Sequence, residues 1–333
     1  MFIFLYSKIS FYLSRLNLTK IVNLLCIKFS YYLSILTNNY VLWGNPAFIS
    51  IEPTNVCNLK CPECPTGGGF STVNKGFATS ELISTLIPNI RRSIVHVNLF
   101  FQGEPFLNKS VIDFAKILSP FTFITVSTNG HFIDKENAGD IINAGFYKII
   151  VSLDGINQEQ YSKYRIGGEF KKVIEAVESL VSAKKRNNSA FPIIELQCLL
   201  FKQTESDKDK FQLLAKELKV DSLRFKTAQF YNRENAREMM PSSANSRYLF
   251  ENDAVIINHR VRNRCWRLWS SSVITWNGDV VPCCFDKDKK YIQGNVFSTQ
   301  LFEVWKHPIY AGFRAKVLYN RKTVDICNNC SEK

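Results

Sequence analysis

The segment Asn55-Val56-Cys57-Asn58-Leu59-Lys60-Cys61-Pro62-Glu63-Cys64 decides the fold of this chain. It places three cysteines at C-x3-C-x2-C spacing directly after an apolar, strand-like run at residues 48–54. A [4Fe-4S] cluster is normally held by four protein thiolates, so three leave one iron open to bind something else. A zinc site would need a fourth ligand at regular spacing, and the next histidine and cysteine are His96 and Cys198. The spacing therefore favours a reactive iron–sulfur site.

Outward from this segment, the chain alternates between strand-like and helix-like patterns. Apolar or β-branched runs occur at residues 48–54, 94–101, 122–128, 147–153, 192–200 and 221–226. Between them, apolar residues recur at helical spacing at 80–92, 108–119, 134–144, 169–186 and 205–218. Repeated β–α units of this kind imply a parallel sheet with helices outside it. The pattern therefore predicts an α/β fold.

The cysteine motif and four later segments together resemble the radical S-adenosylmethionine (radical SAM) superfamily. The later segments are Gln102-Gly103-Glu104-Pro105, Thr128-Asn129-Gly130, Val151-Ser152-Leu153-Asp154-Gly155 and Tyr164-Arg165-Ile166-Gly167-Gly168. The resemblance implies a partial (β/α)6 TIM-like barrel over residues 46–232, with a [4Fe-4S] cluster on Cys57, Cys61 and Cys64. It also implies that the open iron binds S-adenosylmethionine (SAM), which one electron cleaves to methionine and a 5'-deoxyadenosyl radical.

The same resemblance assigns roles to individual residues around SAM. Gly103 and Glu104 would hold its amino group, Ser152 or Asp154 would reach its ribose, and Arg165 would pair with its carboxylate. Asn129 and Gln197 complete the expected cofactor-binding residues. The superfamily often has an aromatic residue before the last motif cysteine, in contact with adenine, whereas this chain has Glu63.

Period-two alternation along the strands predicts what lines the barrel, because side chains two residues apart share a face. One face of the six strands collects polar residues: Glu52, Thr54, His96, Asn98, Ser127, Asn129, Ser152, Asp154, Glu195, Gln197, Arg224 and Lys226. A barrel with a polar lumen is suited to a polar ligand, although any one of these residues could be a hydrogen-bonded structural group. Asp154 and Glu195 are the candidate catalytic residues, as acceptors of a substrate proton.

A second group of cysteines lies near the end of the chain. Cys265 is followed by twelve residues, Gly278, four more residues and Cys283, and Cys327 and Cys330 come later. This stretch resembles the SPASM/twitch extension of radical SAM enzymes, over residues 260–333 after a linker or helix at 233–259. Its four cysteines would hold a second, auxiliary [4Fe-4S] cluster, and a four-cysteine zinc site has the same ligand count. Cys284, next to Cys283, is expected to be a buried thiol or a substrate-side residue.

The first 45 residues differ in composition from the rest. Their only charged residues are Lys8, Arg15, Lys20 and Lys28, and no acidic residue precedes Glu52. Apolar residues recur at helical spacing from Leu5 to Leu16 and from Ile21 to Leu36, which predicts two amphipathic N-terminal helices over residues 1–45. Two interpretations remain: the helices pack on the barrel, or they make a peripheral contact with a membrane surface.

Composition limits the remaining function classes. Ten cysteines without a cleavable signal sequence indicate a reducing, cytoplasmic location. The net charge of +13 is dispersed along the chain without a nucleic-acid-binding motif, so no nucleic-acid partner is expected. The resemblance implies an external one-electron reductant of the flavodoxin or ferredoxin type.

The function predicted from these features is hydrogen-atom abstraction from a small-molecule or peptide substrate, with a two-electron oxidation assisted by the auxiliary cluster. Two alternatives stay open: a peptide or sulfatase maturase, and a non-catalytic iron–sulfur sensor or binding protein.

Overall fold

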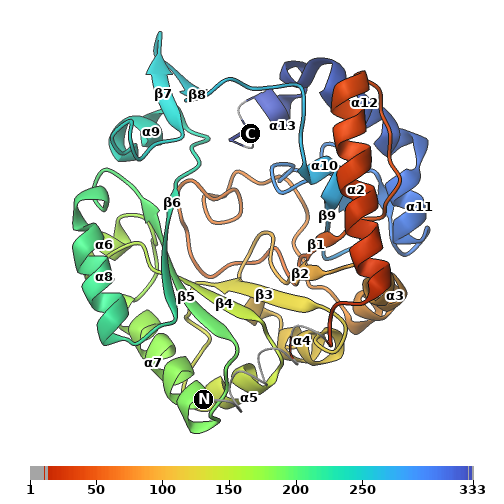
Figure 1. Cartoon of the computed structure of the whole chain (residues 1–333). Helices are drawn as coiled ribbons and strands as arrows, with labels where there is room; N and C mark the ends of the chain where they lie inside the picture. Colours follow the sequence, from red (N-terminus) through yellow and green to blue (C-terminus); the bar gives the residue numbers. More distant parts are fainter. Residues whose placement is uncertain (1–10, 12–13, 329, 332–333) are drawn as a thin grey trace.

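The computed structural model describes residues 11, 14–328 and 330–331 (Figure 1). Six parallel strands form the barrel wall in chain order: β1 (Phe48–Ile51), β2 (His96–Asn98), β3 (Phe123–Thr128), β4 (Lys148–Ser152), β5 (Ile193–Leu200) and β6 (Ser222–Thr227). The predicted α/β fold is therefore confirmed, with each strand inside the run predicted for it except for one residue at the end of β6. The strand β2 is much shorter than its apolar run.

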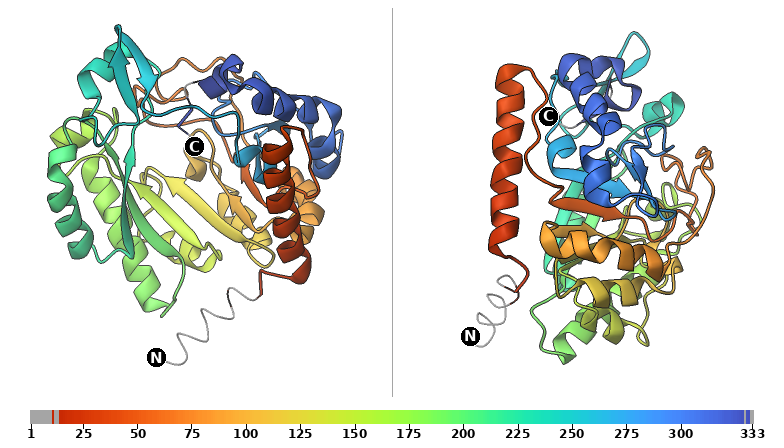
Figure 2. Two further views of the ribbon diagram at one scale, coloured as in Figure 1. Left: turned by 45° about the horizontal axis from the view of Figure 1, so that its top comes forward. Right: turned by 90° about the vertical axis from the view of Figure 1, so that its right-hand side faces the viewer.

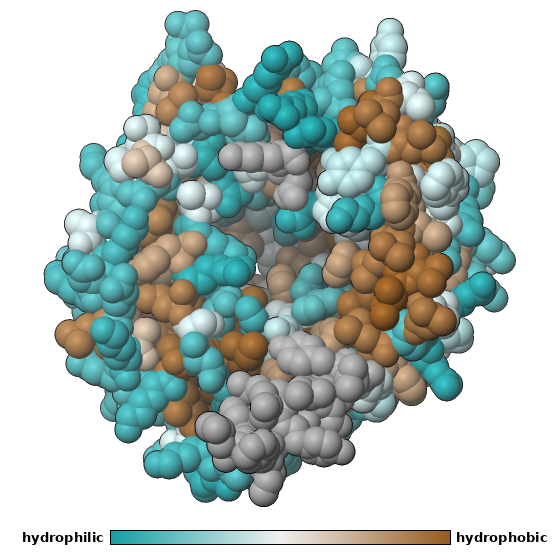
Figure 3. All heavy atoms as spheres, viewed as in Figure 1, coloured by the Kyte–Doolittle hydropathy of each residue, from teal (hydrophilic) through white to brown (hydrophobic). Residues whose placement is uncertain are grey.

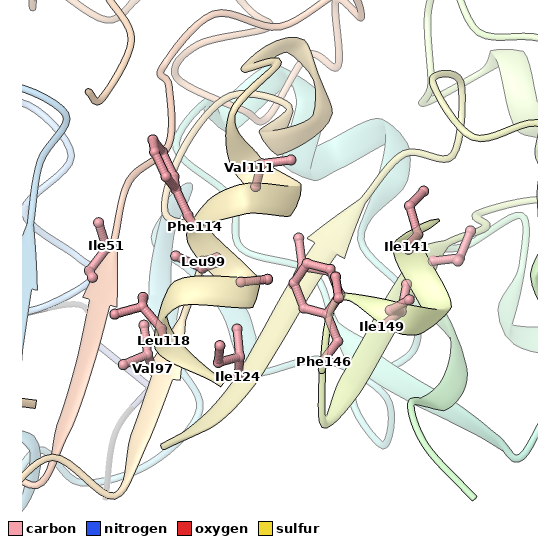
Figure 4. Packing of buried hydrophobic residues seen from close by; sticks show 14 of the residues in the cluster. Ile51, Val97, Leu99, Val111, Phe114, Leu118, Ile124, Ile141, Phe146 and Ile149 are labelled. Atoms are coloured by element: carbon pink, nitrogen blue, oxygen red, sulfur yellow. The ribbon is translucent and has the colours of Figure 1, made fainter. Parts of the chain in front are cut away.

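Helices pack on the outside of these strands. They are α3 (Ser80–Arg92), α4 (Val111–Leu118), α5 (Ala138–Asn143), α6 (Gln158–Ser162), α7 (Phe170–Arg186) and α8 (Lys208–Glu217), with short 3-10 turns at Pro105–Leu107 and Glu205–Asp207. The outward-facing strand residues Val97, Leu99, Ile124 and Ile149 meet Phe114 and its neighbours from α4 and α5 (Figure 4). This apolar layer leaves the opposite face of each strand for polar side chains, as the alternation predicts.

The C-terminal strands extend the barrel sheet instead of forming a separate one. The order is β11-β10-β9-β1-β2-β3-β4-β5-β6, and β9 (Ser271–Ile274) pairs in parallel with β1. β10 (Asp279–Val281) and β11 (Gly294–Asn295) continue it in antiparallel fashion. Gly278, at φ +85°, forms the turn between β9 and β10, as its Asn-Gly sequence predicts. Cys283, two residues after β10, is thereby fixed at the edge of this sheet.

Short elements complete the C-terminal half. They are α9 (Arg233–Met239), β7 (Tyr248–Glu251), β8 (Ala254–Ile257), α10 (Arg267–Ser270), α11 (Leu301–Lys306), α12 (Pro308–Asn320), a 3-10 turn at Arg321–Thr323, and α13 (Asp325–Asn328). β7 and β8 form a separate hairpin.

The N-terminal helix α2 (Leu18–Thr37) lies along one side of the molecule (Figure 2). Its inner face packs on the C-terminal half, where Ile27 and Tyr31 contact the cluster that contains Trp269. Its outer face is apolar and exposed, and brown side chains gather over it in Figure 3. The second predicted N-terminal helix is therefore confirmed, whereas the first falls largely on residues 1–10 and 12–13, outside the described residues.

Candidate active site

The loop that carries Cys57, Cys61 and Cys64 follows β1 and emerges on the side of the barrel away from α2 (Figure 2). It has no regular secondary structure, so hydrogen bonds to neighbouring segments hold it. The Thr54 hydroxyl donates to the Gly76 carbonyl at 2.7 Å and accepts from the Val56 amide at 3.0 Å. The Lys60 amide donates to the Ile166 carbonyl at 2.9 Å, which joins the loop to the segment of Arg165.

Gly103 lets the segment after β2 lie directly against the cysteine loop. Its φ is +69°, and a Cβ atom there would stand 2.5 Å from the Thr54 carbonyl oxygen and 2.6 Å from that of Val56. The Glu104 amide donates to the same Val56 carbonyl at 2.8 Å. Only glycine accommodates both this backbone conformation and this approach.

The carboxylate of Glu104 joins this segment to the end of β3. Oε1 accepts hydrogen bonds from the Thr128 hydroxyl at 2.7 Å and the Phe106 amide at 3.2 Å, and Oε2 accepts from the Asn129 amide at 2.7 Å. Burial raises the pKa of Glu104 to about 7, while these hydrogen bonds act in the opposite direction. Both carboxylate oxygens are thus engaged, so the geometry favours a positioning role for Glu104 over a direct contact with SAM.

Asn129 links the end of β3 to the cysteine loop. Its Nδ2 donates to Asn58 Oδ1 at 2.7 Å, and its Oδ1 accepts from the His131 amide at 3.0 Å. Asn58 lies inside the cysteine motif, and the sequence alone gives no sign of this contact. Ser152, at the end of β4, is buried and lines a cavity that also contains the three motif cysteines.

Arg165 and Asp154 form a buried ion pair beside the cysteines. Arg165 Nε lies 2.6 Å from Asp154 Oδ2, and the Leu199 amide donates to Asp154 Oδ1 at 2.6 Å. Arg165 Nη1 lies 3.9 Å from Cys61 Sγ. Asp154 therefore orients the guanidinium, and its engaged oxygens argue against its predicted role as proton acceptor.

These groups enclose a cavity of about 210 Å³. Its lining includes the three motif cysteines, Gly103, Glu104, Thr128, Asn129, Ser152, Tyr164 and Arg165. Burial raises the pKa of the Cys57 thiol and raises that of Cys61 to about 11. Three thiols that line one cavity, with the Arg165 guanidinium beside Cys61, fit an iron–sulfur cluster that displaces their protons on binding.

Glu195 and Gln197 lie on the lumen face of β5, outside this cavity. Glu195 is the third residue of an eight-residue strand, and its Oε2 lies 2.9 Å from Lys148 Nζ. This contact favours a structural role for Glu195, as the partner of Lys148, over its predicted role as proton acceptor. Gln197 lies between Ser152 and Arg224 in the strand register.

Glu63 has a structural role that replaces the expected aromatic contact. It is buried, and its Oε2 accepts hydrogen bonds from the amides of Tyr231, at 2.5 Å, and Asn232, at 3.3 Å. The carboxylate thus ties the cysteine loop to the segment that enters α9. A contact across this sequence separation leaves no local pattern in the sequence.

The second group of cysteines is also brought together. Cys265, Cys283, Cys327 and Cys330 are all buried. Burial raises the pKa of Cys327 to about 12, and the charge of Cys265 adds to that effect. Burial likewise raises the pKa of Cys283, with further contributions from Cys284, Cys265 and Cys327.

Arg321 is a cation buried beside this group, which sequence analysis missed. Its side chain donates from Nη1 to the Arg264 carbonyl at 2.8 Å. Thiolates of Cys265, Cys330 and Cys327 raise its pKa, although burial lowers it. A buried guanidinium beside three of the four thiols fits a negatively charged cluster.

Cys284 points elsewhere. It is partly exposed, its Sγ lies 3.8 Å from Arg267 Nη1, and its charge influences Tyr231 and Lys226. Cys283 and Cys284 follow the end of β10 in a bend and a turn, with Cys283 buried and Cys284 partly exposed, so the choice of Cys283 as the ligand stays a prediction. Across residues 11, 14–328 and 330–331, no three Cys, His, Asp or Glu side chains converge closely enough to hold a single metal ion.

Family models match most of the chain. Residues 51–211 match the radical SAM superfamily, and residues 265–331 match SPASM, an iron-sulfur cluster-binding domain. The chain belongs to the radical SAM superfamily and has a C-terminal SPASM domain. The superfamily domain binds a [4Fe-4S] cluster and SAM, and the SPASM domain binds auxiliary iron–sulfur clusters.

The curated relatives include enzymes of two kinds. The chain is 31% identical over 140 residues to a probable GTP 3',8-cyclase of Methanosarcina acetivorans, covering 40% of this chain and 42% of that protein. The match therefore spans about two fifths of the cyclase. The mycofactocin maturase MftC of Mycolicibacterium smegmatis is 24% identical over 291 residues, covering 79% of this chain and 70% of that protein.

Solved structures share the fold. SuiB of Streptococcus suis bound to S-adenosylmethionine superposes with a TM-score of 0.61 at 15% identity, over 86% of this chain and 71% of that chain. BtrN in complex with AdoMet and 2-DOIA superposes with a TM-score of 0.53 at 18% identity, over 88% of this chain and 94% of that chain. These likenesses support the partial TIM-like barrel.

Proposed function

We propose that the chain is a radical SAM enzyme that removes a hydrogen atom from a polar substrate and passes the substrate's remaining electron to an auxiliary cluster. The observation that supports it most is that Cys57, Cys61 and Cys64 line one cavity with Glu104, Ser152 and Arg165, while a second group of four buried cysteines lies in the C-terminal half. When bound and reduced by a flavodoxin- or ferredoxin-type partner, the cluster and SAM supply a 5'-deoxyadenosyl radical.

The chain's own residues would position this chemistry. Cys57, Cys61 and Cys64 would hold the cluster, and Arg165, oriented by Asp154, would bind the SAM carboxylate. Gly103 and Glu104 would hold the segment after β2 against the cysteine loop. Cys265, Cys283, Cys327 and Cys330 would hold the auxiliary cluster, with Arg321 offsetting its charge.

Two substrate classes fit the proposal. A small polyol or amine would need only the lumen, whereas a peptide needs an entrance between the barrel and the C-terminal half. A cavity of about 310 Å³ lies there, lined by Phe70, Tyr231, Phe285 and Asp288 among others. This second cavity and the similarity to MftC over most of the chain favour a peptide maturase as the second candidate.

SAM cleavage tests the enzymatic proposal. Anaerobically reconstituted protein, given dithionite and no substrate, is expected to convert SAM slowly to 5'-deoxyadenosine and methionine, measured by chromatography. Protein with its full iron content that cleaves no SAM would instead support the sensor. Product analysis with short peptides and with polyols then separates the two substrate classes.

We also propose that α2 makes a peripheral contact with anionic lipid. Its outer face exposes seven large apolar side chains: Leu18, Ile21, Val22, Leu25, Phe29, Tyr32 and Leu36. Lys28 is exposed on the same helix, and the absence of acidic residues before Glu52 suits a negatively charged surface.

The packing of α2 favours lying on the membrane over crossing it. By length and composition, the helix Leu18–Thr37 is long and apolar enough to span a bilayer. Its inner face, however, packs on its own protein, because the Tyr31 ring contacts the rings of Trp266 and Trp269. A helix with one face on its own protein and one apolar face outward is suited to the interface.

A further inference from the structure

The lumen face of β6 carries two exposed basic side chains at alternate positions, Arg224 and Lys226. Arg247 lies beside them and is fixed by hydrogen bonds from its Nε to the Thr227 hydroxyl at 2.7 Å and from its Nη1 to the Ser331 hydroxyl at 2.7 Å. We refer to Arg224, Lys226 and Arg247 as the basic wall.

Charges facing the basic wall do not balance it. Glu195 is the carboxylate nearest Arg224, at 4.0 Å from Nε, and it already lies 2.9 Å from Lys148 Nζ. Lys226 has no hydrogen-bond or ion-pair partner within the described part of the chain. Burial lowers the pKa of Lys226, and the charge of Arg224 lowers it further. Arg224 and Lys226 both keep exposed surface on this face of β6, so an anion that enters the lumen can reach both charges.

An unpaired acceptor lies next to the basic wall. Gln197 is paired in register with Arg224 on one side and Ser152 on the other, so it shares their lumen face. Its Oε1 is buried and has no hydrogen-bond partner among the described residues. A ligand that presents a hydroxyl or amide hydrogen beside an anionic group would satisfy both Gln197 and Lys226.

The basic wall lies near both cysteine groups. The charge of Cys284 acts on Lys226, and Cys284 and Cys64 both act on Tyr231. Ser152, two strands from Lys226, lines the cavity of the motif cysteines. A ligand on the wall would therefore lie where a substrate must lie to meet both cofactor sites.

We propose that Arg224 and Lys226 bind an anionic group of the substrate, a phosphate or a carboxylate, while Gln197 accepts a hydrogen bond from a neighbouring hydroxyl or amide. This inference rests on the proposed function and specifies its substrate class. Guanidinium and ammonium groups together are suited to anionic oxygens, the first by paired hydrogen bonds and the second as a point charge.

Trace acetylation of the reconstituted protein tests the inference directly. With SAM bound, the protein is labelled briefly with acetic anhydride, and the acetylation of each lysine is quantified by mass spectrometry. Pyrophosphate and malonate are the probes, and choline is the cationic control. Acetylation of Lys226 is expected to fall about fivefold or more with an anion, whereas that of exposed Lys185 stays unchanged.

Protection by pyrophosphate alone would specify a phosphate group, and protection by malonate alone a carboxylate. Arg224→Gln should weaken the protection, because the guanidinium supplies part of the site, whereas Lys185→Gln should not. Equal acetylation of Lys226 with and without both anions would overturn the inference, as would equal protection in Arg224→Gln. Because labelling needs no turnover, protein that fails to cleave SAM yet shows this protection would refute the proposed function alone.

Discussion

At the scale of single residues, the carboxylates near the cavity position other groups. Glu104 holds the end of β3, Asp154 orients Arg165, and Glu63 ties the cysteine loop to the entry of α9. Each accepts at least two hydrogen bonds, which is the usual condition for burying a carboxylate. Both oxygens of Glu104 and of Asp154 are thus engaged, whereas Glu63 accepts both of its hydrogen bonds at Oε2.

Glu52 accepts fewer hydrogen bonds than these three carboxylates, and it yields a prediction about pH. Its Oε2 accepts one hydrogen bond, from the Trp276 amide at 3.2 Å, while its buried Oε1 has no partner in the described structure. Burial raises its pKa to about 7, above the ordinary value of 4.5. The folded state therefore binds this proton more tightly, so the stabilisation that it provides in acid is lost as pH rises from about 4.5 through about 7.

Glu52→Gln should remove that loss because the neutral amide needs no proton. Urea denaturation at pH 5 to 8 measures the free energy of unfolding of both proteins. The value for the variant minus that for the wild type is expected to increase with pH, by up to about 3 kcal/mol at pH 8. Exposed Glu81→Gln is the control and should follow the wild type. Parallel pH profiles for wild type and Glu52→Gln would contradict the assignment.

Cys283 and Cys284 are adjacent, yet we expect opposite effects from them. Cys283→Ala should lose the auxiliary cluster's electron paramagnetic resonance signal and product formation but keep SAM cleavage, because the other site shares none of its thiols. Cys284→Ala should keep both cluster signals. If the two results are exchanged, the ligand set becomes Cys265, Cys284, Cys327 and Cys330.

At the scale of elements, Gly103 shows how one position holds two segments together. Gly103→Ala would place a methyl group 2.5 Å from the Thr54 carbonyl oxygen, at a positive φ, and the backbone cannot yield cheaply there. The variant should lose the cluster at Cys57, Cys61 and Cys64, leaving about four irons per chain. Gly139→Ala in α5 is the matched control, since nothing lies within 4 Å of the added methyl, and it should keep its iron. Full iron in Gly103→Ala would show that the close approach is dispensable.

The apolar face of α2 predicts binding to vesicles. Replacing Leu25, Phe29 and Leu36 with Gln removes three exposed apolar side chains, each worth about 1 kcal/mol or more at an interface, so binding should fall at least about tenfold. Co-sedimentation with phosphatidylglycerol vesicles measures it. Ile309→Gln, an exposed apolar residue of α12, is the control. Recovery of wild type and triple variant in the supernatant to the same extent would leave α2 with its packing role alone.

The elements also show how far the sequence could predict the fold and the site. Strand runs and the polar lumen face were predictable because burial on one side imposes a period of two. The same alternation places Glu195 in the lumen without saying how far along the barrel it lies. The ion pair with Lys148 indicates a structural role for Glu195, and Lys148 belongs to a different strand, β4. The pairing of β9 with β1, across more than 200 residues, likewise has no local signal.

At the scale of the whole molecule, the two cysteine groups belong to one continuous structure. β1 pairs with β9, Gln102 Nε2 donates to the Lys287 carbonyl at 2.9 Å, and Lys287 Nζ donates to the Phe101 carbonyl at 3.2 Å. These contacts fix the C-terminal half against the segment that borders the cysteine loop. The distance and orientation between the proposed clusters are therefore properties of the fold and do not depend on a flexible linker.

Iron content tests whether the two sites nevertheless fill independently. Reconstituted wild-type protein should hold about eight irons per chain, and the variant with Cys57, Cys61 and Cys64 all changed to Ala should hold about four. The expectation follows because the auxiliary thiols and Arg321 all lie within residues 265–330. Cys265 and Cys327 pack in a core cluster with Trp269 and Tyr310, which the substitutions do not touch. Iron and zinc are measured together by plasma mass spectrometry, with Cys198→Ala, a buried non-ligand thiol, as the control. About four irons in the wild type with one zinc per chain would replace the auxiliary cluster by a zinc site, and loss of all iron in the triple variant would mean that the auxiliary site forms only on an intact cysteine loop.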